Sequence, residues 1–176
     1  MTLALSGDSP SFSGTFQGGT LTLGTAQNTT SGTAIDFTGI PSWVKRITVM
    51  LNGVSTNGSS PLQVQVGAGS IATTGYQSSV GYAPGAGQFT VSTSGLICES
   101  TGSSSSGNTL QGSMVISLLG SNVWCEHCGF YATANTIQQN GGGSVTLSGT
   151  LDRIRLTTVN GTDTFDAGSV NILYEG

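Results

Sequence analysis

The residues best suited to chemistry form one short run, Trp124–Cys128, with the sequence WCEHC. A Cys-x-x-Cys pair supports thiol redox chemistry when its first thiolate lies at a helix N-terminus, where the helix dipole stabilises it. The residues after Cys128, GFYATANTIQQNGGG, show no helical periodicity and no βαβ context. The pattern therefore does not favour a redox site.

Zinc is the second chemistry that this run suggests. Cys98, Cys125, His127 and Cys128 together would complete a Cys₃His ligand set. On a regular strand, however, Cys125 and Cys128 point to opposite faces, because side chains alternate along a strand. We therefore expect isolated thiols, no metal and no cofactor, with zinc held by these four residues as the alternative.

Two further features could in principle support catalysis. His127 is the single histidine, and no G-x-S-x-G nucleophile motif is present, so we expect no catalytic residue and no enzyme. Asp163 and Asp166 lie close together near Gly161 and Gly168, where aspartates commonly cap backbone N–H groups. We expect that capping role for both.

The basic residues offer two interpretations. One is that they cover solvated strand faces and protect sheet edges from aggregation. The other is that, with so few charges in the chain, they form ion pairs between protomers. The residues of these candidate pairs are Lys45, Arg46, Arg153 and Arg155 with Asp36, Asp152 or Glu175.

The elements that must position these residues read as strands. Only 7% of the 176 residues are charged, 28 are glycine, and β-branched and aromatic residues recur in short runs between Gly, Ser and Asn. That composition is typical of an all-β domain. We predict an antiparallel β-sandwich, specifically a jelly roll, over residues 34–176, preceded by an N-terminal arm for attachment over residues 1–33.

Local patterns predict about nine to eleven strands. Trp43–Asn52 is apolar on both faces and is expected to be a central strand. Ser113–Leu119 and Val123–Ala132 are expected to form a hairpin. Residues 67–87 are expected to be an exposed loop with one short strand, residues 100–108 a flexible loop tip, and residues 141–143 a turn.

Charge and hydropathy exclude two classes of partner. The net charge is −4, the sequence pI is about 4.5, and no basic cluster is present, so we expect no nucleic-acid partner. The N-terminus MTLALSGDSP does not resemble a signal peptide, and no apolar stretch approaches the ~20 residues needed to span a bilayer. We expect synthesis in the cytoplasm and no membrane insertion.

Two segments resemble a known family. They are residues 34–80, which include DFTGIPSWVKRITVMLNGVSTNGSS, and residues 143–175, which include LDRIRLTTVNGTDTFDAGSVNILYE. Both resemble a β-rich domain common in the virion proteins of tailed bacteriophages, most often tail-fibre or tail proteins. The resemblance implies a structural protein on the exterior of the virion, a jelly-roll fold and a homotrimer. Residues 81–142 lie outside the family pattern.

The resemblance leaves two roles open. Because only about 33 residues precede the match, we expect a small decoration, or cement, protein that docks on the outside of the capsid and contacts the major capsid protein. The alternative is a tail-fibre or head-fibre tip that contacts a host-surface glycan or protein. An aromatic-lined groove would favour the fibre tip, and a flat docking face would favour the decoration protein.

Overall fold

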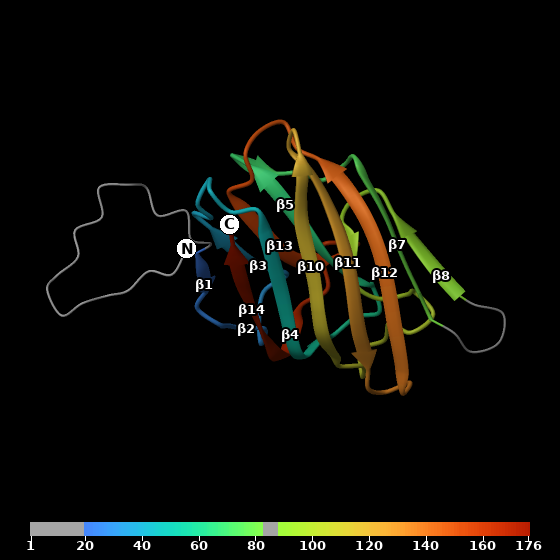
Figure 1. Cartoon of the computed structure of the whole chain (residues 1–176). Coiled ribbons are helices and arrows are strands. Elements are labelled where there is room, and N and C mark those ends of the chain that lie inside the picture. Colours follow the sequence, from blue (N-terminus) through green and yellow to red (C-terminus); the bar gives the residue numbers. More distant parts are fainter. Residues whose placement is uncertain (1–19, 83–87) are drawn as a thin grey trace, which may run out of the picture.

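The chain folds into two antiparallel β-sheets that pack face to face as a sandwich around one apolar core (Figure 1). The structure is a computed structural model and describes residues 20–82 and 88–176. These two ranges contain fourteen strands and no helix. They therefore contain no helix that could cross a membrane. The predicted all-β antiparallel sandwich is confirmed, with more strands than expected.

The larger sheet has nine strands, and five neighbouring strands of 10 or 11 residues form its centre. Its order is β1 (Leu21–Leu23), β14 (Phe165–Glu175), β4 (Arg46–Thr56), β10 (Leu110–Gly120), β11 (Val123–Ala132), β12 (Ile137–Thr146), β7 (Tyr76–Tyr82) and β8 (Gln88–Ser92), with β2 (Gln27–Asn28) also paired to β14.

The smaller sheet has five strands and lies behind the larger one in Figure 1. Its order is β3 (Ala34–Thr38), β13 (Arg153–Thr158), β5 (Leu62–Ala68) and β6 (Ser70–Ile71), with β9 (Leu96–Ile97) also paired to β5.

Period-2 alternation places the core between the sheets. On β4, Ile47, Val49 and Leu51 are at most 4% exposed and face the smaller sheet. On β13, Ile154 and Leu156 are 1% exposed and face the opposite way to Arg153 and Arg155. β4 lies between β14 and β10, so its predicted central position is confirmed, although it continues to Thr56.

The predicted hairpin is also confirmed, because β10 pairs with β11 around a tight turn. Ser121 and Asn122 both have positive φ, at 48° and 61°. Two consecutive left-handed residues make the type I′ geometry that suits the right-handed twist of paired strands.

Three local predictions were wrong. The described part of residues 67–87 holds two strands, β6 and β7, rather than one short strand in an exposed loop, and Tyr76 of β7 is only 1% exposed. Residues 141–143 are not a turn but part of β12. Glycine is needed there because the backbone of β7 lies very close to β12. A Cβ on Gly143 would lie 2.5 Å from the backbone oxygen of Gln77. Residues 100–108 are not a free loop tip but are hydrogen-bonded to the sandwich.

The predicted arm covers residues 1–33, and part of it belongs to the sandwich. β1 pairs with the C-terminal end of β14, and the Thr20 N–H donates to the Gly176 carbonyl at 2.9 Å. β2 pairs with Ser169 and Val170 of β14. The remainder of the predicted arm, residues 1–19, lies outside the described residues.

Candidate functional site

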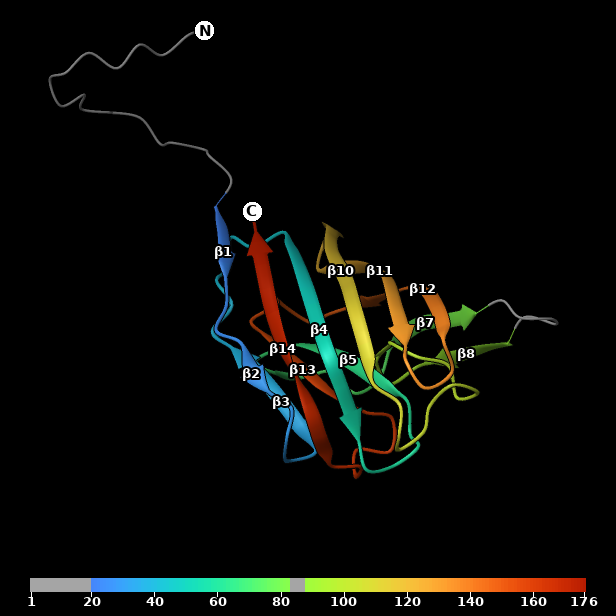
Figure 2. The ribbon, with the colours of Figure 1, turned by 90° about the horizontal axis from the view of Figure 1, so that it is seen from below.

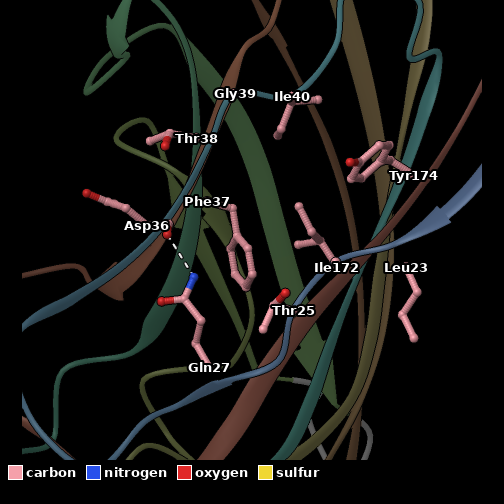
Figure 3. Close-up of a pocket in the computed structure, with 11 residues that line it drawn as sticks. Leu23, Thr25, Gln27, Asp36, Phe37, Thr38, Gly39, Ile40, Ile172 and Tyr174 are labelled. Carbon is pink, nitrogen blue, oxygen red and sulfur yellow. Dashed lines mark hydrogen bonds between the residues drawn. The ribbon is translucent and has the colours of Figure 1, made fainter.

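A groove of about 500 Å³ opens along one side of the sandwich, between β3 and the segment from β1 to β2. Figure 2 shows β2 beside β3 at this side of the molecule. β3 is the first strand of the five-stranded sheet and has a free edge here. Phe37 from β3 and Ile172 from β14 face each other across the groove (Figure 3).

Polar groups line part of the groove. The Gln27 amide donates from Nε2 to the Asp36 carbonyl at 2.8 Å, so a side chain satisfies this part of the β3 edge (Figure 3). Thr25, Thr38 and the Tyr174 ring also line the groove. Hydroxyl and amide groups beside apolar side chains suit binding of a ligand with both polar and apolar surface.

The Asp36 side chain points away from the groove in Figure 3, and its carboxylate is already engaged. The Arg155 guanidinium donates from Nε and Nη2 to its two oxygens at 2.7 and 2.8 Å. These hydrogen bonds hold the pKa of Asp36 below its usual value of 3.8. A carboxylate clamped in this way is a poor general base, so Asp36 contributes charge pairing rather than acid–base chemistry.

One exposed aromatic residue lies beside the groove. Trp43 is 39% exposed, and its ring centroid is 5.9 Å from that of Tyr174, with the planes tilted by 49°. Such tilted pairs are a favourable arrangement of aromatic rings. Tyr174 therefore links the groove to the exposed face of Trp43.

The candidate ion-pair residues come together in three pairs, and each pair closes within one chain. Arg46 meets Glu175 at 2.9 Å, Arg153 meets Asp152 at 2.7 Å, and Arg155 meets Asp36 at 2.7 Å. The sequence suggests pairing between protomers as one possibility, but within a chain these carboxylates already have guanidinium partners. Lys45 is in none of these three pairs.

The candidate zinc ligands do not converge. On β11, Cys128 is fully buried, whereas His127 is exposed and Cys125 is half-buried on the same side as His127. Cys98 is also fully buried. The predicted opposite-face placement of Cys125 and Cys128 is thus confirmed, and among the described residues no three His, Cys, Asp or Glu side chains are arranged to hold a metal.

The surroundings of the two buried thiols, Cys98 and Cys128, make both of them unreactive. Burial raises the pKa of Cys128 to about 12, and the nearby Glu126 acts in the same direction. Burial also raises the pKa of Cys98 well above its usual value of 9.0. The thiolate is the nucleophilic form, so neither thiol suits redox or nucleophilic chemistry.

A buried carboxyl group is the feature that sequence analysis missed. Glu126 points into the core from β11 and is 7% exposed. Its Oε1 accepts a hydrogen bond from the Ser78 hydroxyl at 3.3 Å, while its Oε2 has no partner. Burial raises the pKa of Glu126 to about 7. The strand alternation around Trp124 and Cys128 could have placed Glu126 inside.

A second buried carboxyl group follows β9. Glu99 is 6% exposed, and burial raises its pKa to about 7. It accepts hydrogen bonds from the Leu62 N–H at 3.1 Å and the Ser104 hydroxyl at 3.4 Å. Glu99 therefore ties residues 100–108 to β5, and no sequence signal marked it.

One of the two aspartates considered for catalysis caps a turn. Asp163 accepts the Ser60 N–H at 2.9 Å and the Asn160 amide at 2.6 Å. Asp166 accepts a hydrogen bond from the Ser55 hydroxyl. The capping prediction is confirmed for Asp163, while Asp166 bonds a side chain instead.

Comparison with known proteins adds no relative. No protein-family model matches the chain, and neither the curated proteins nor the solved structures yield a match.

Proposed function

We propose that this chain is a non-enzymatic structural protein of a tailed-bacteriophage virion, a small trimeric decoration protein on the outside of the capsid. The proposal begins from the resemblance of residues 34–80 and 143–175 to phage tail and tail-fibre domains. Its partners are two further copies of itself and the major capsid protein. It needs neither a cofactor nor a metal.

One observation supports this proposal most strongly: the two resembling segments form one unit in space. β13 from the second segment pairs on either side with β3 and β5 from the first. β14, also from the second segment, pairs with β4 from the first over most of its length. Two segments separated by about 60 residues therefore interlock, which supports treating them as parts of one domain.

The path of the chain also supports the finer assignment to a jelly roll. β3, β4 and β5 pass from the smaller sheet to the larger and back, and β13 and β14 repeat the crossing. β13 then lies between β3 and β5, while β14 lies beside β4. This interleaving is the winding by which jelly rolls build their two sheets. Residues 81–142 extend the larger sheet beyond that unit.

Quantitative mass spectrometry of purified particles tests the proposal. Chymotrypsin is the suitable protease, because the four Lys and Arg residues give trypsin few sites. Hundreds of copies per particle would support a decoration protein, and tens or fewer would support a fibre. Absence from purified particles, with the protein present in the infected cell, would overturn both roles.

The groove favours a second candidate function, a fibre tip that binds a host-surface glycan. Tyr174 and the neighbouring Trp43 offer aromatic faces, and Gln27, Thr25 and Thr38 offer hydrogen-bonding groups. Glycan-array binding by wild-type protein, lost in Trp43→Ala and kept in the distant Tyr131→Ala, would support this function. Absence of binding on a broad array would count against it.

A further inference from the structure

The outward face of the nine-stranded sheet carries almost no charge. Its five long neighbouring strands, β14, β4, β10, β11 and β12, alternate between side chains that enter the core and side chains that point away from it. We call the second set the uncharged face. Its central residues are Asn171 and Leu173 on β14, Thr48 and Met50 on β4, Ser113, Val115 and Ser117 on β10, Cys125, His127 and Tyr131 on β11, and Asn140, Gly142 and Ser144 on β12.

Formal charges on this side lie only at strand ends, as far as the described residues go. Arg46 and Glu175 pair with each other where β4 begins and β14 ends. Asp166 lies at the opposite end of β14, bonded to Ser55. Between these ends, the middle of the face carries no Asp, Glu, Lys or Arg side chain.

The opposite side of the sandwich differs sharply. β3 and β13 present the Asp36–Arg155 pair, and Asp152, just before β13, pairs with Arg153, the first residue of that strand. Asp163 adds a further negative charge in the β13–β14 connection. Five charged side chains thus lie on this side, whereas the middle of the uncharged face carries none.

Exposed apolar side chains are concentrated on the outward side of the larger sheet. The described residues include eight large hydrophobic side chains that are well exposed. Five of them point outward from this sheet by strand register, namely Leu21 and Leu23 on β1, Phe89 and Val91 on β8, and Tyr131 on β11. β1 and β8 are the edge strands, so four of the five lie at the two edges of this face, where they can contact a partner that covers it.

The size of the face matches a stable protein interface. Five strands about 4.8 Å apart and about 33 Å long cover roughly 800 Å². A standard protein–protein interface buries about 800 Å² on each partner. The five long strands alone reach this size, and the edge strands β1 and β8 add their exposed apolar side chains to it.

We propose that the uncharged face is a self-association surface, with a second copy of this chain as its partner. Two acidic copies can approach through this face because it carries no net charge to repel its counterpart. The number of copies in the assembly, three, is taken from the proposed function. The choice of this face as the surface of contact does not depend on that function.

Thr48 is the residue that tests the surface most cleanly. It lies at the centre of the face, opposite Leu173 on β14 and Val115 on β10 in the strand register. Glutamate at this position would place a carboxylate in the interface of each copy, where a buried unpaired charge costs several kcal/mol. Thr38→Glu makes the same chemical change on β3, on the other side of the sandwich, and serves as the matched control.

Sedimentation velocity over a concentration series measures the self-association of each protein. Circular dichroism verifies that each variant is folded. We expect wild type to associate at micromolar concentrations, T48E to associate at least about tenfold more weakly, and T38E to match wild type. A wild type that stays monomeric, or a T48E protein that associates like wild type, overturns the proposal.

Hydrogen exchange on unmodified protein keeps the test independent of any variant. Peptides from β4, β10 and β11 should be more protected at high protein concentration than at low concentration, while β3 and β13 should not change. Protection confined to β3 and β13 would overturn the surface assignment. A face-dependent dimer would support the surface but contradict the trimer of the proposed function, so the two claims fail separately.

Discussion

The side-chain oxygen of Gln139 accepts a hydrogen bond from the backbone N–H of Ser100 at 2.6 Å. The same oxygen accepts the Ser103 hydroxyl at 2.9 Å, and Gln139 is fully buried in β12. A single amide in the nine-stranded sheet thus anchors the Ser/Gly-rich segment that follows β9. This segment is part of the packed structure, and Ser100 and Ser103 are each 1% exposed.

Replacing Gln139 with Leu should free this segment. The change leaves the Ser100 N–H without its partner, and an unsatisfied buried donor costs about 1–3 kcal/mol. We expect that loss in the free energy of unfolding and faster hydrogen exchange across residues 100–108. Gln138→Leu, at the exposed neighbouring position of β12, is the control and should change exchange in this segment little. Unchanged exchange in Q139L would contradict the anchor.

Glu126 should make the protein less stable as the pH rises. Its folded-state pKa of about 7 lies above the ordinary value of 4.5, so the folded protein binds this proton more tightly than the unfolded chain. The stabilising contribution is full below pH 4.5 and is lost as the pH rises through 7.

Glu126→Gln removes that titration. We expect the variant to gain about 1–3 kcal/mol over wild type at pH 8 and to gain nothing at pH 5, as measured by urea unfolding. Glu175→Gln, on an exposed and paired carboxylate, is the control and should not reproduce this pH-dependent gain. An E126Q variant that keeps the wild-type difference between pH 5 and pH 8 would exclude Glu126 as the source.

The thiols should differ in reactivity as their positions differ. Cys125 is half-buried on the outward side of β11, while Cys98 and Cys128 are fully buried and have raised pKa values. We expect one thiol per folded chain to react with a thiol reagent, and a Cys125→Ser variant to react only on unfolding. Cys128→Ala should cost about 1–2 kcal/mol, as for loss of a small buried hydrophobe. Stoichiometric zinc in the purified protein would contradict this description.

The Asp36–Arg155 pair should contribute little to stability despite its good geometry. Both side chains are more than one third exposed, and exposed ion pairs typically contribute about 0.2–1 kcal/mol. Asp36→Asn should cost no more than that at low salt, and the cost should shrink at high salt. Because the pKa of Asp36 is lowered, wild type should lose this contribution as the pH falls below 3.8. A loss of several kcal/mol would show that the pair lies in a buried interface between copies.

The N-terminal residues 1–14, which lie outside the described residues, are proposed to supply attachment to the particle. Deleting Met1–Gly14 leaves every described strand intact, since the first of these, β1, begins at Leu21. We expect the truncated protein to keep its cooperative unfolding transition but not to join the particle. Incorporation at the wild-type copy number would place the attachment site on the sandwich itself.

The alternation of apolar and polar side chains made the strands predictable where one face of a strand packs on the core and the other does not. β4, β11 and β13 follow the predicted pattern because Ile47, Cys128 and Ile154 and their alternate neighbours point into the core. The same alternation predicts that Cys125 and Cys128 lie on opposite faces of β11, and they do. The ion-pair residues do meet one another, although their pairs close within the chain.

The glycine and serine runs were misinterpreted because these residues occur both in turns or loops and at closely packed positions. Gly141 and Gly143 suggested a turn, yet they lie in β12, where β7 passes too close for a Cβ. Ser100 and Ser103 suggested a flexible loop, yet Gln139 and Glu99 hold that segment through long-range hydrogen bonds. Neither use can be read from local composition, because each depends on a partner far away in the chain.

The groove could not be predicted for a similar reason. Phe37 and Ile172 are 135 residues apart and meet only because β3 and β14 lie at the same side of the sandwich. Each alone reads as an ordinary core residue in an alternating strand.

A difference map between particles with and without this protein tests the central claim most directly. Cryo-electron microscopy of wild-type particles and of particles from a strain lacking the gene would be compared after capsid reconstruction. The proposed function predicts difference density at repeated positions on the capsid exterior. No difference density on the head or the tail, together with absence of the protein from wild-type particles, would contradict a virion structural role.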